Sequence, residues 1–139
     1  MAFTGSLDVR RLQGDKWEIL TPYRYYLLDT GEYCEIHKGF VTDLASIPFP
    51  FSRVFLPMGK SYDWASVTHD FLYWLPYVWS DLQTCRKIGR WEADRVYLQA
   101  MEESKTPWFV RRSLYAGVRC GGGWPWAKYR EMENANIVR

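Results

Sequence analysis

The stretch DWASVTHDFLYWLP, residues 63–76, marks the point at which the hydrophobic spacing changes from strand-like to helical. Trp64, Val67 and Phe71 recur at intervals of three and four, so they share one helical face. Asp63 stands where an N-cap is expected, because a carboxylate can accept hydrogen bonds from the first backbone N–H groups of a helix. The proline at the end of the stretch cannot continue a helix. The stretch therefore predicts a helix that begins at residue 63 and ends before the proline.

Two further helices are expected after this one. Residues 86–103, with residue 90 as a later start, carry apolar residues at helical spacing. The stripe consists of Ala93, Val96, Tyr97, Ala100 and Met101. Thr106-Pro107 is typical of a helix start, because proline is tolerated at the first helical position. This third helix is expected to end at the glycine run 121–123. The segment 124–139 is aromatic and then charged, and we expect an irregular tail.

The region before the helices has short aromatic and β-branched segments separated by turn residues. Short turns between short strands predict antiparallel hairpins, and we expect three or four strands in a meander. The expected strands are residues 7–12, 16–20, 24–28 and 33–38. Residues 39–51 contain one glycine and two prolines, which indicates an ordered loop.

The predicted fold class is therefore α+β, with a small N-terminal antiparallel β-meander followed by about three α-helices. We expect a single domain over residues 1–139, with strands and loop in 1–48, helices in 63–121 and the irregular tail in 124–139. Residues 77–85, between the first two helices, are expected to form a connection in which Ser80-Asp81 could start a short helix.

Aromatic residues are the unusual part of the composition. The chain is 47% hydrophobic, as expected for a globular protein, and its 8 Trp, 10 Tyr and 7 Phe make up 18% of the residues. Large rings bury much area per residue, and they also suit contacts between proteins. The surplus predicts a core rich in aromatic rings, and some of the excess rings could belong to an interface with another protein.

The net charge of +2 argues against a general nucleic-acid binder or a DNA-handling protein. The stretch from Thr106 to the end holds six basic and two acidic residues. We expect these charges to keep a terminal segment in solution, with contact to an anionic surface as the alternative.

The cysteines Cys34, Cys85 and Cys120 are odd in number and lack C-x-x-C spacing, so a reducing compartment is expected rather than a disulfide framework. The first residues have neither a basic nor an apolar region of the kind found in signal peptides. No apolar run approaches the roughly 18 residues of a membrane span. These features predict a soluble protein or a part of a larger soluble assembly.

The chemically useful residues concentrate around His69, at the edge of the buried stripe of the first helix. Asp94 flanks the apolar stripe of the second helix, where a carboxylate needs a partner. If the two helices pack antiparallel, Asp94 can reach a nitrogen of His69. An aspartate on one imidazole nitrogen fixes the tautomer and leaves the other nitrogen free to accept a proton from water.

Two roles for this group remain open. Asp70 and Asp43 could supply carboxylate oxygens to a metal, and a hard cation such as calcium wants several oxygens. Alternatively, the pair of His69 and Asp94 simply holds two helices together, with Tyr73 donating a third hydrogen bond.

Other polar residues are weaker candidates. Arg86 and Arg90 are expected to be partners of Asp94 or surface groups rather than anion binders. The glycine run 121–123 lacks the lysine and the strand–helix context of a phosphate loop. His37 stands alone in a predicted strand, where a cross-strand residue is a better interpretation than a ligand. No cofactor-binding residue is assigned.

Three motifs in order resemble a family of small, functionally unassigned proteins found mostly in tailed bacteriophages and prophages. The motifs are Gly39-Phe40-x-Thr42-Asp43-Leu44-Ala45-Ser46-Ile47-Pro48, His69-Asp70-x-x-Tyr73 and Arg90-x-x-Ala93-Asp94. The resemblance covers about residues 36–123. It implies a phage setting, often beside structural or lysis genes, and no established reaction.

The pattern His69-Asp70-x-x-Tyr73 followed by Asp94 is also similar to the helix pair of phospholipase A2 enzymes. The resemblance implies that His69 is the base that activates water, that Asp70 binds calcium, and that Asp94 orients the histidine with support from Tyr73. The chain departs from those enzymes in two ways, because their glycine-rich calcium loop and their disulfides are missing here.

Two functions follow as expectations. The first is a virion component, in the tail or baseplate, that is made in the host bacterial cytoplasm and binds other phage structural proteins or further copies of itself. The alternative is a metal-assisted hydrolase of the bacterial envelope, with a phospholipid or a cell-wall bond as substrate and calcium as its cation.

Overall fold

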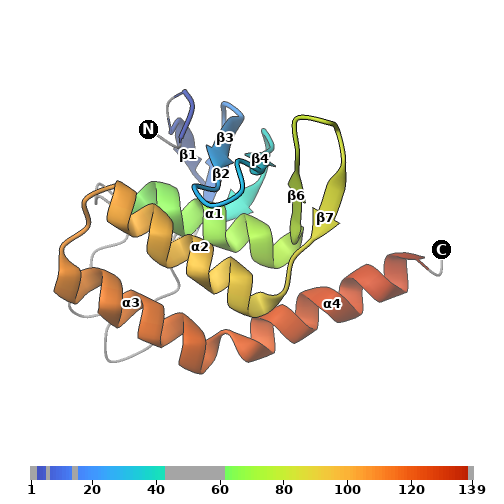
Figure 1. Ribbon diagram of the computed structural model, residues 1–139. Coiled ribbons are helices and arrows are strands. Elements are labelled where there is room, and N and C mark those ends of the chain that lie inside the picture. Colours follow the sequence, from blue (N-terminus) through green and yellow to red (C-terminus); the bar gives the residue numbers. More distant parts are fainter. Residues whose placement is uncertain (1–2, 6, 14–15, 43–61, 138–139) are drawn as a thin grey trace.

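A computed structural model describes residues 3–5, 7–13, 16–42 and 62–137 of the protein. Among these residues, antiparallel strands come first and four helices follow, with a further β-hairpin between the first two helices, so the predicted α+β class is confirmed (Figure 1). No helix in the described ranges is both long enough and apolar enough to cross a membrane.

The strands form two small sheets rather than one meander. The first sheet consists, in spatial order, of β1 (Val9–Arg11), β2 (Trp17–Ile19) and β5 (Val41–Thr42). The second consists, in spatial order, of β3 (Tyr23–Tyr26), β4 (Tyr33–Ile36), β6 (Tyr77–Trp79) and β7 (Cys85–Lys87). All pairs are antiparallel, and in the β3–β4 hairpin Tyr23 pairs with Ile36 and Tyr26 with Tyr33. The predicted meander divides because β5 pairs with β2, whereas β4 pairs with β6.

Residues 77–85 were predicted to be a connection in which Ser80-Asp81 could start a short helix, and this is wrong. The segment forms a β-hairpin of β6 and β7, with Tyr33 of β4 paired to Trp79 of β6. Val78 is fully buried at the centre of β6. Aromatic and β-branched residues favour strands where an edge is available, and β4 supplies that edge. Ser80 lies in the turn, where its hydroxyl contacts that of Thr84.

Three of the four helices were predicted from the sequence. They are α1 (Asp63–Trp74), α2 (Arg90–Glu103) and α3 (Trp108–Gly121). Their caps differ slightly from expectation, because Asp63 is the first helical residue rather than the N-cap, and Pro107 rather than Thr106 is the N-cap of α3. Neither N-cap side chain makes a capping hydrogen bond.

The predicted irregular tail is also wrong, because residues 123–137 form a fourth helix, α4 (Gly123–Ile137). Arg130 donates hydrogen bonds to the carbonyl oxygens of Tyr73 and Trp74, at 2.7 and 2.8 Å, where α1 ends. The Arg130 guanidinium also lies over the Trp126 ring, at 4.6 Å. Tyr77 donates a hydrogen bond of 2.7 Å to Glu133. The tail is therefore ordered by contacts with distant parts of the chain, which local sequence does not reveal.

Helix α1 is the central element of the fold. It contacts β4 and β5 on one side and α2 and α4 on the other, and Figure 1 shows the sheets on one side of α1 and α2 with α3 on the other. Residues from both parts share one core cluster, in which Ile36, Leu72, Ala93 and Met101 have no exposed surface. This arrangement buries most of α1, including the polar side chains discussed next.

Candidate functional site

The site is built around Asp94, a carboxylate with 0% exposure in the middle of α2. Its neighbours Ala93 and Val96 belong to the apolar core. A carboxylate in such surroundings is costly unless hydrogen bonds and opposite charge compensate for the loss of water. The contacts of Asp94 therefore define the site.

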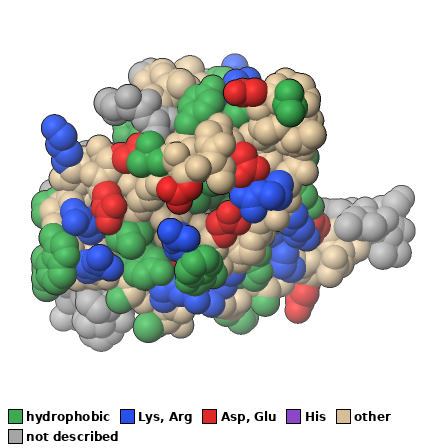
Figure 2. Space-filling view, viewed as in Figure 1, with side chains coloured by type: hydrophobic (Ala, Val, Ile, Leu, Met, Phe, Trp, Pro, Cys, Tyr) green, Lys and Arg blue, Asp and Glu red, His purple; other side chains and the backbone are tan. Residues whose placement is uncertain are grey.

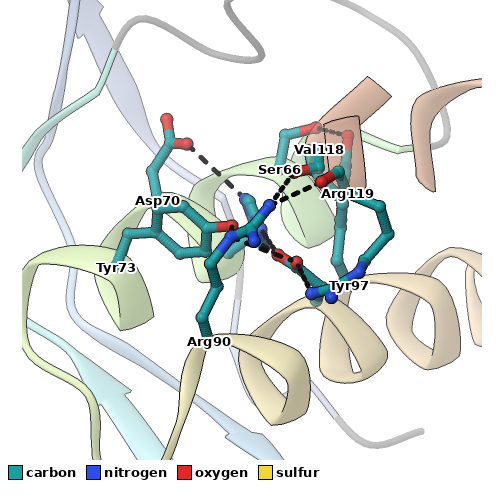
Figure 3. Close-up of polar contacts among 9 residues, drawn as sticks. Ser66, Asp70, Tyr73, Arg90, Tyr97, Val118 and Arg119 are labelled. Carbon is teal, nitrogen blue, oxygen red and sulfur yellow. Dashed lines mark hydrogen bonds and ion pairs between the residues drawn. The ribbon is translucent and has the colours of Figure 1, made fainter. Parts of the chain in front are cut away.

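Both oxygens of Asp94 are engaged. Figure 3 shows Tyr73, Arg90 and Arg119, which reach the site from three different helices. Oδ1 lies 2.7 Å from His69 Nε2 and accepts a hydrogen bond of 2.6 Å from the Tyr73 hydroxyl. Oδ2 accepts a hydrogen bond of 2.7 Å from the Arg119 guanidinium and lies 3.9 Å from Arg90 Nε. The carboxylate thus has two donors from α1 and one from α3, with a second cation one helical turn away on α2.

Helical spacing explains why two donors come from α1. His69 and Tyr73 are four residues apart and therefore lie on the same face, one turn from each other. The contacts between the helices pair Ser66 with Tyr97, His69 with Asp94, and Tyr73 with Arg90. Residue numbers rise on one helix as they fall on the other, so α1 and α2 are antiparallel and the contact expected from the sequence is present.

The imidazole ring of His69 is held between two aromatic rings. The Tyr97 ring stacks on it at a centroid distance of 4.6 Å, and the Tyr73 ring lies tilted at 4.3 Å. Nε2 faces Asp94, whereas Nδ1 lies 3.9 Å from Asp70 Oδ1, beyond hydrogen-bonding distance. The ring therefore has one nitrogen fixed by a buried carboxylate and one directed towards a half-exposed carboxylate.

Burial sets the protonation of this pair. It lowers the pKa of His69 below its ordinary value of 6.5, and this outweighs the opposite effect of the hydrogen bond to Asp94. Burial would raise the pKa of Asp94, but the hydrogen bonds from His69, Tyr73 and Arg119 outweigh it and hold the pKa below 3.8. At neutral pH the pair consists of a neutral imidazole and a carboxylate. Nε2 then carries the proton that it donates to Asp94, and Nδ1 has a free lone pair.

Tyr73 remains a donor under the same conditions. Burial, followed by its hydrogen bond to Asp94, raises the pKa of its phenol. Tyr73 also accepts a hydrogen bond of 3.3 Å from Arg90 Nε. Its role in the site is thus to donate one fixed hydrogen bond to the carboxylate.

Asp70 was predicted as a metal ligand, together with Asp43. The structure places Asp70 beside His69 with its side chain 28% exposed, where it accepts a hydrogen bond from the hydroxyl of Thr42 on β5. Asp43 lies outside the described residues. In the described parts of the chain there is no group of three or more His, Cys, Asp or Glu side chains that could hold a metal ion.

Arg119 is the site residue that sequence reasoning missed. It lies in the last turn of α3, 25 residues away from Asp94, and no motif marks it. The available signal was indirect, because a buried carboxylate beside a neutral histidine needs a cation. From the sequence, Arg90 and Arg86 were the expected partners of Asp94. Arg86 instead bonds Glu32 and Glu92 at the surface.

Arg90 anchors the end of α3 at the site. Its guanidinium donates hydrogen bonds to the carbonyl oxygens of Val118, at 2.9 Å, and Arg119, at 2.7 Å. The turn that follows passes close to the site, because a Cβ atom at Gly122 would lie less than 3.0 Å from the Tyr73 hydroxyl and the Val118 carbonyl. Only glycine fits this approach. The junction of α3 and α4 therefore sets where Arg119 meets Asp94.

His37 belongs to a different part of the molecule. It lies just beyond the end of β4, exposed, with its ring edge-on to Phe71 at 5.2 Å, so the predicted cross-strand position is wrong. With Glu35, Phe71 and Trp79 it lines a cavity of about 300 Å³. Phe71 and His69 point to opposite sides of α1, because residues two apart differ by about 200° around a helix. This cavity is therefore separate from the Asp94 site.

Fold and site together define a small α+β protein with a histidine, a tyrosine and an arginine converging on one buried carboxylate. The chain belongs to the family described as "Protein of unknown function (DUF1353)", whose model matches residues 17–118. The prediction of a functionally unassigned family is confirmed at this level. The matched range includes His69, Asp70, Tyr73 and Asp94 and ends one residue before Arg119. No curated protein and no solved structure matches the chain.

Proposed function

We propose that this protein is a component of a bacteriophage particle, in the tail or baseplate, and that it carries a hydrolytic site acting on the bacterial envelope. The observation that supports hydrolysis is the orientation of His69. Its Nε2 is bound to a buried carboxylate, while Nδ1 is unprotonated and lies on the side of half-exposed Asp70. A general base needs this combination of fixed tautomer and free nitrogen.

In the proposed reaction, Nδ1 of His69 takes a proton from a water molecule as the water oxygen attacks the carbonyl carbon of an ester. Asp94 stabilises the imidazolium that forms, while Tyr73 and Arg119 hold the Asp94 carboxylate in position. The imidazolium then returns its proton to the leaving alkoxide as the C–O bond breaks. The products are a carboxylic acid and an alcohol, and His69 is neutral again.

A phospholipid ester is the substrate that fits this chemistry most directly, and the resemblance to the phospholipase A2 helix pair supports it. A cell-wall bond is the second substrate to test. Calcium binding by Asp70 and Asp43 is part of the proposal, since Asp70 stands next to the base. Within the described residues Asp70 is a single carboxylate, fewer than a calcium ion requires, so no step of the reaction is assigned to the ion.

The phage setting rests on the resemblance described above and on surface composition. Trp91, on α2, is 57% exposed, and the Arg95 guanidinium lies over its ring at 4.8 Å. Exposed aromatic residues together with arginine are typical of contact surfaces in assemblies. The expected partners are other phage structural proteins or further copies of this chain.

The test of hydrolysis compares His69→Ala with the native protein on phospholipid vesicles and on purified peptidoglycan. Release of fatty acid or of soluble wall fragments is measured, with and without calcium. We expect His69→Ala to lower the rate about 100-fold or more, because general-base catalysis contributes on this scale. His37→Ala, at the exposed histidine, is the matched control and should keep full activity. Equal circular dichroism spectra would exclude unfolding as the cause.

Activity that survives in His69→Ala would rule out the proposed base. A rate that depends on calcium and loses this dependence in Asp70→Asn would support the metal role.

The proposal that the protein is part of the phage particle has its own test, which is mass spectrometry of purified phage particles. Absence of the chain from particles, when the infected cells contain it, would contradict a virion component.

A further inference from the structure

Helix α3 has an unusual distribution of charge. It contains Arg111, Arg112 and Arg119 and no acidic residue. It buries a single residue, Leu114, whereas α2 buries six. Arg119 is paired with Asp94 and Arg111 lies 3.9 Å from Glu102, so Arg112 is the exposed cation of this helix.

Large aromatic side chains are exposed near both ends of α3. Trp108 and Phe109, in the first turn of α3, are 62% and 67% exposed. Arg112 lies three and four residues after them, on the same exposed side of the helix. At the start of α4, Trp124 is 73% exposed and Lys128 lies over its ring at 5.0 Å. Trp108 and Phe109 therefore have Arg112 one helical turn away, and Trp124 has Lys128 over its ring.

The surface view agrees with this arrangement. In Figure 2, hydrophobic side chains and Lys and Arg side chains lie next to one another over α3. Isolated exposed hydrophobic residues are normal, but a larger exposed apolar patch with a polar rim marks a site of interaction with a protein, a membrane or a ligand.

We propose that Trp108, Phe109, Arg112, Trp124 and Lys128, the α3 surface, dock the protein on an anionic phospholipid bilayer. Tryptophan and phenylalanine rings favour the boundary between headgroups and acyl chains. Arginine and lysine beside them favour the negative headgroups of such a bilayer. The α3 surface supplies both kinds of side chain, and α3 offers no carboxylate that would repel the headgroups.

A bilayer fits better than nucleic acid. Nucleic-acid binding depends on neutralising several phosphates, and the net charge of the chain is only +2. Two basic side chains near three large rings suit insertion of the rings with electrostatic help. The docking surface does not include His69 or Asp94, so this inference stands apart from the hydrolytic reaction.

The first experiment is co-sedimentation of the full chain with vesicles of phosphatidylglycerol and, separately, of phosphatidylcholine. We expect binding to phosphatidylglycerol vesicles that is at least tenfold stronger than to phosphatidylcholine vesicles and that weakens with salt. The double substitution Trp108→Ala with Phe109→Ala should lower binding to phosphatidylglycerol at least tenfold. Arg112→Glu should also lower it, with a smaller effect on phosphatidylcholine.

Two substitutions serve as matched controls. Leu82 is 85% exposed in the β6–β7 turn, so Leu82→Ala removes an exposed apolar side chain away from α3. Lys38→Glu reverses an exposed charge on the strand side of the molecule. Both should bind like the native protein. Equal loss of binding in the controls and the α3 variants would overturn the proposed surface.

Four further outcomes test the proposed docking surface. No binding to either vesicle, or binding to single-stranded nucleic acid in place of vesicles, would overturn the inference. Native binding by His69→Ala would support docking as a separate property. Vesicle binding without hydrolysis would leave the docking surface standing while the hydrolytic proposal fails.

Discussion

Two groups of charged residues tie α2 to the rest of the molecule, and they make a useful comparison. Asp94 is buried and holds His69, Tyr73 and Arg119. Arg86, on β7, is 44% exposed and bonds Glu92 on α2 and Glu32 in the loop before β4. The hydrogen bonds in the two groups are of similar length, between 2.6 and 3.1 Å. The bond lengths alone would suggest that the two groups stabilise the protein to a similar extent.

Burial makes the difference between them. When an exposed ion pair is broken, water solvates both partners, so such pairs contribute about 0 to 1 kcal/mol. When one member of a buried group is removed, the others stay in a place that water does not reach, and the loss is about 3–5 kcal/mol. The contribution of a charged contact to the stability of this protein therefore depends on whether water can solvate the group that remains when its partner is removed.

The largest effect is expected for Asp94→Ala. The substitution leaves buried His69 and Tyr73 without their acceptor in the core, and it leaves Arg119, whose side chain is 33% exposed, without its ion-pair partner. We expect the free energy of unfolding to fall by about 3–5 kcal/mol, as measured by urea denaturation. Asp94→Asn keeps the shape and one acceptor oxygen, so its loss should be smaller. If Asp94→Ala stayed within about 1 kcal/mol of the native protein, the buried group would resemble the exposed one and the comparison would fail.

A second effect tests the junction that brings Arg119 to the site. In Gly122→Ala the new methyl group meets Tyr73 and Val118 at less than 3.0 Å, so α3 or Tyr73 must shift. We expect a loss of about 1–3 kcal/mol in the free energy of unfolding, as for other overpacked sites. The neighbouring Gly123→Ala is the matched control, since its Cβ would make only ordinary contacts with Arg90 at 3.8 Å or more. Equal stability of the two variants would show that the junction is not tightly packed.

The third test uses pH. The pKa of buried His69 is lowered from 6.5, so below pH 6.5 the unfolded chain binds a proton that the folded protein does not. The stabilising contribution is complete above pH 6.5, and it is lost as pH falls from 6.5 through the pKa of the folded state. Denaturation series at several pH values should show this decline in the native protein and a flatter profile in His69→Gln. His37→Gln is the matched control, and a decline unchanged in His69→Gln would assign it to another group.

The loss of the hydrogen bond in His69→Gln should also be visible at neutral pH, where we expect about 1–3 kcal/mol. Asp94 adds a second decline at lower pH. Its pKa is held below 3.8, so its contribution is lost only as pH falls below that value. The His69 decline begins at pH 6.5 and the Asp94 decline begins at 3.8, so the onset of each decline distinguishes the two residues in one titration.

The smallest effect is expected for Arg86→Ala. Four hydrogen bonds to Glu32 and Glu92 disappear, but all three side chains keep contact with water. We expect the free energy of unfolding to change by less than about 1 kcal/mol, and the change to shrink in high salt. A loss comparable to that of Asp94→Ala would show that the exposed group, rather than the buried one, holds α2 in place.

The sequence by itself determined the elements with strong local signals. The apolar spacing of residues 63–74 and 90–103 defines α1 and α2, because a helical period needs no information from elsewhere in the chain. The same spacing places His69 and Tyr73 on one face and Asp94 beside the stripe of the next helix. The geometric core of the site could thus be predicted, since both helices bury the stripes that flank these residues.

Only the tertiary structure decided the rest. The β6–β7 hairpin depends on the free edge of β4, and α4 depends on contacts of Arg130 and Glu133 with the end of α1 and with β6. Arg119 meets Asp94 because Arg90 and Gly122 fix the turn between α3 and α4. These features arise from partners far apart in the sequence. A local pattern records what one segment prefers, whereas the partner of a buried charge is chosen by where the whole chain packs.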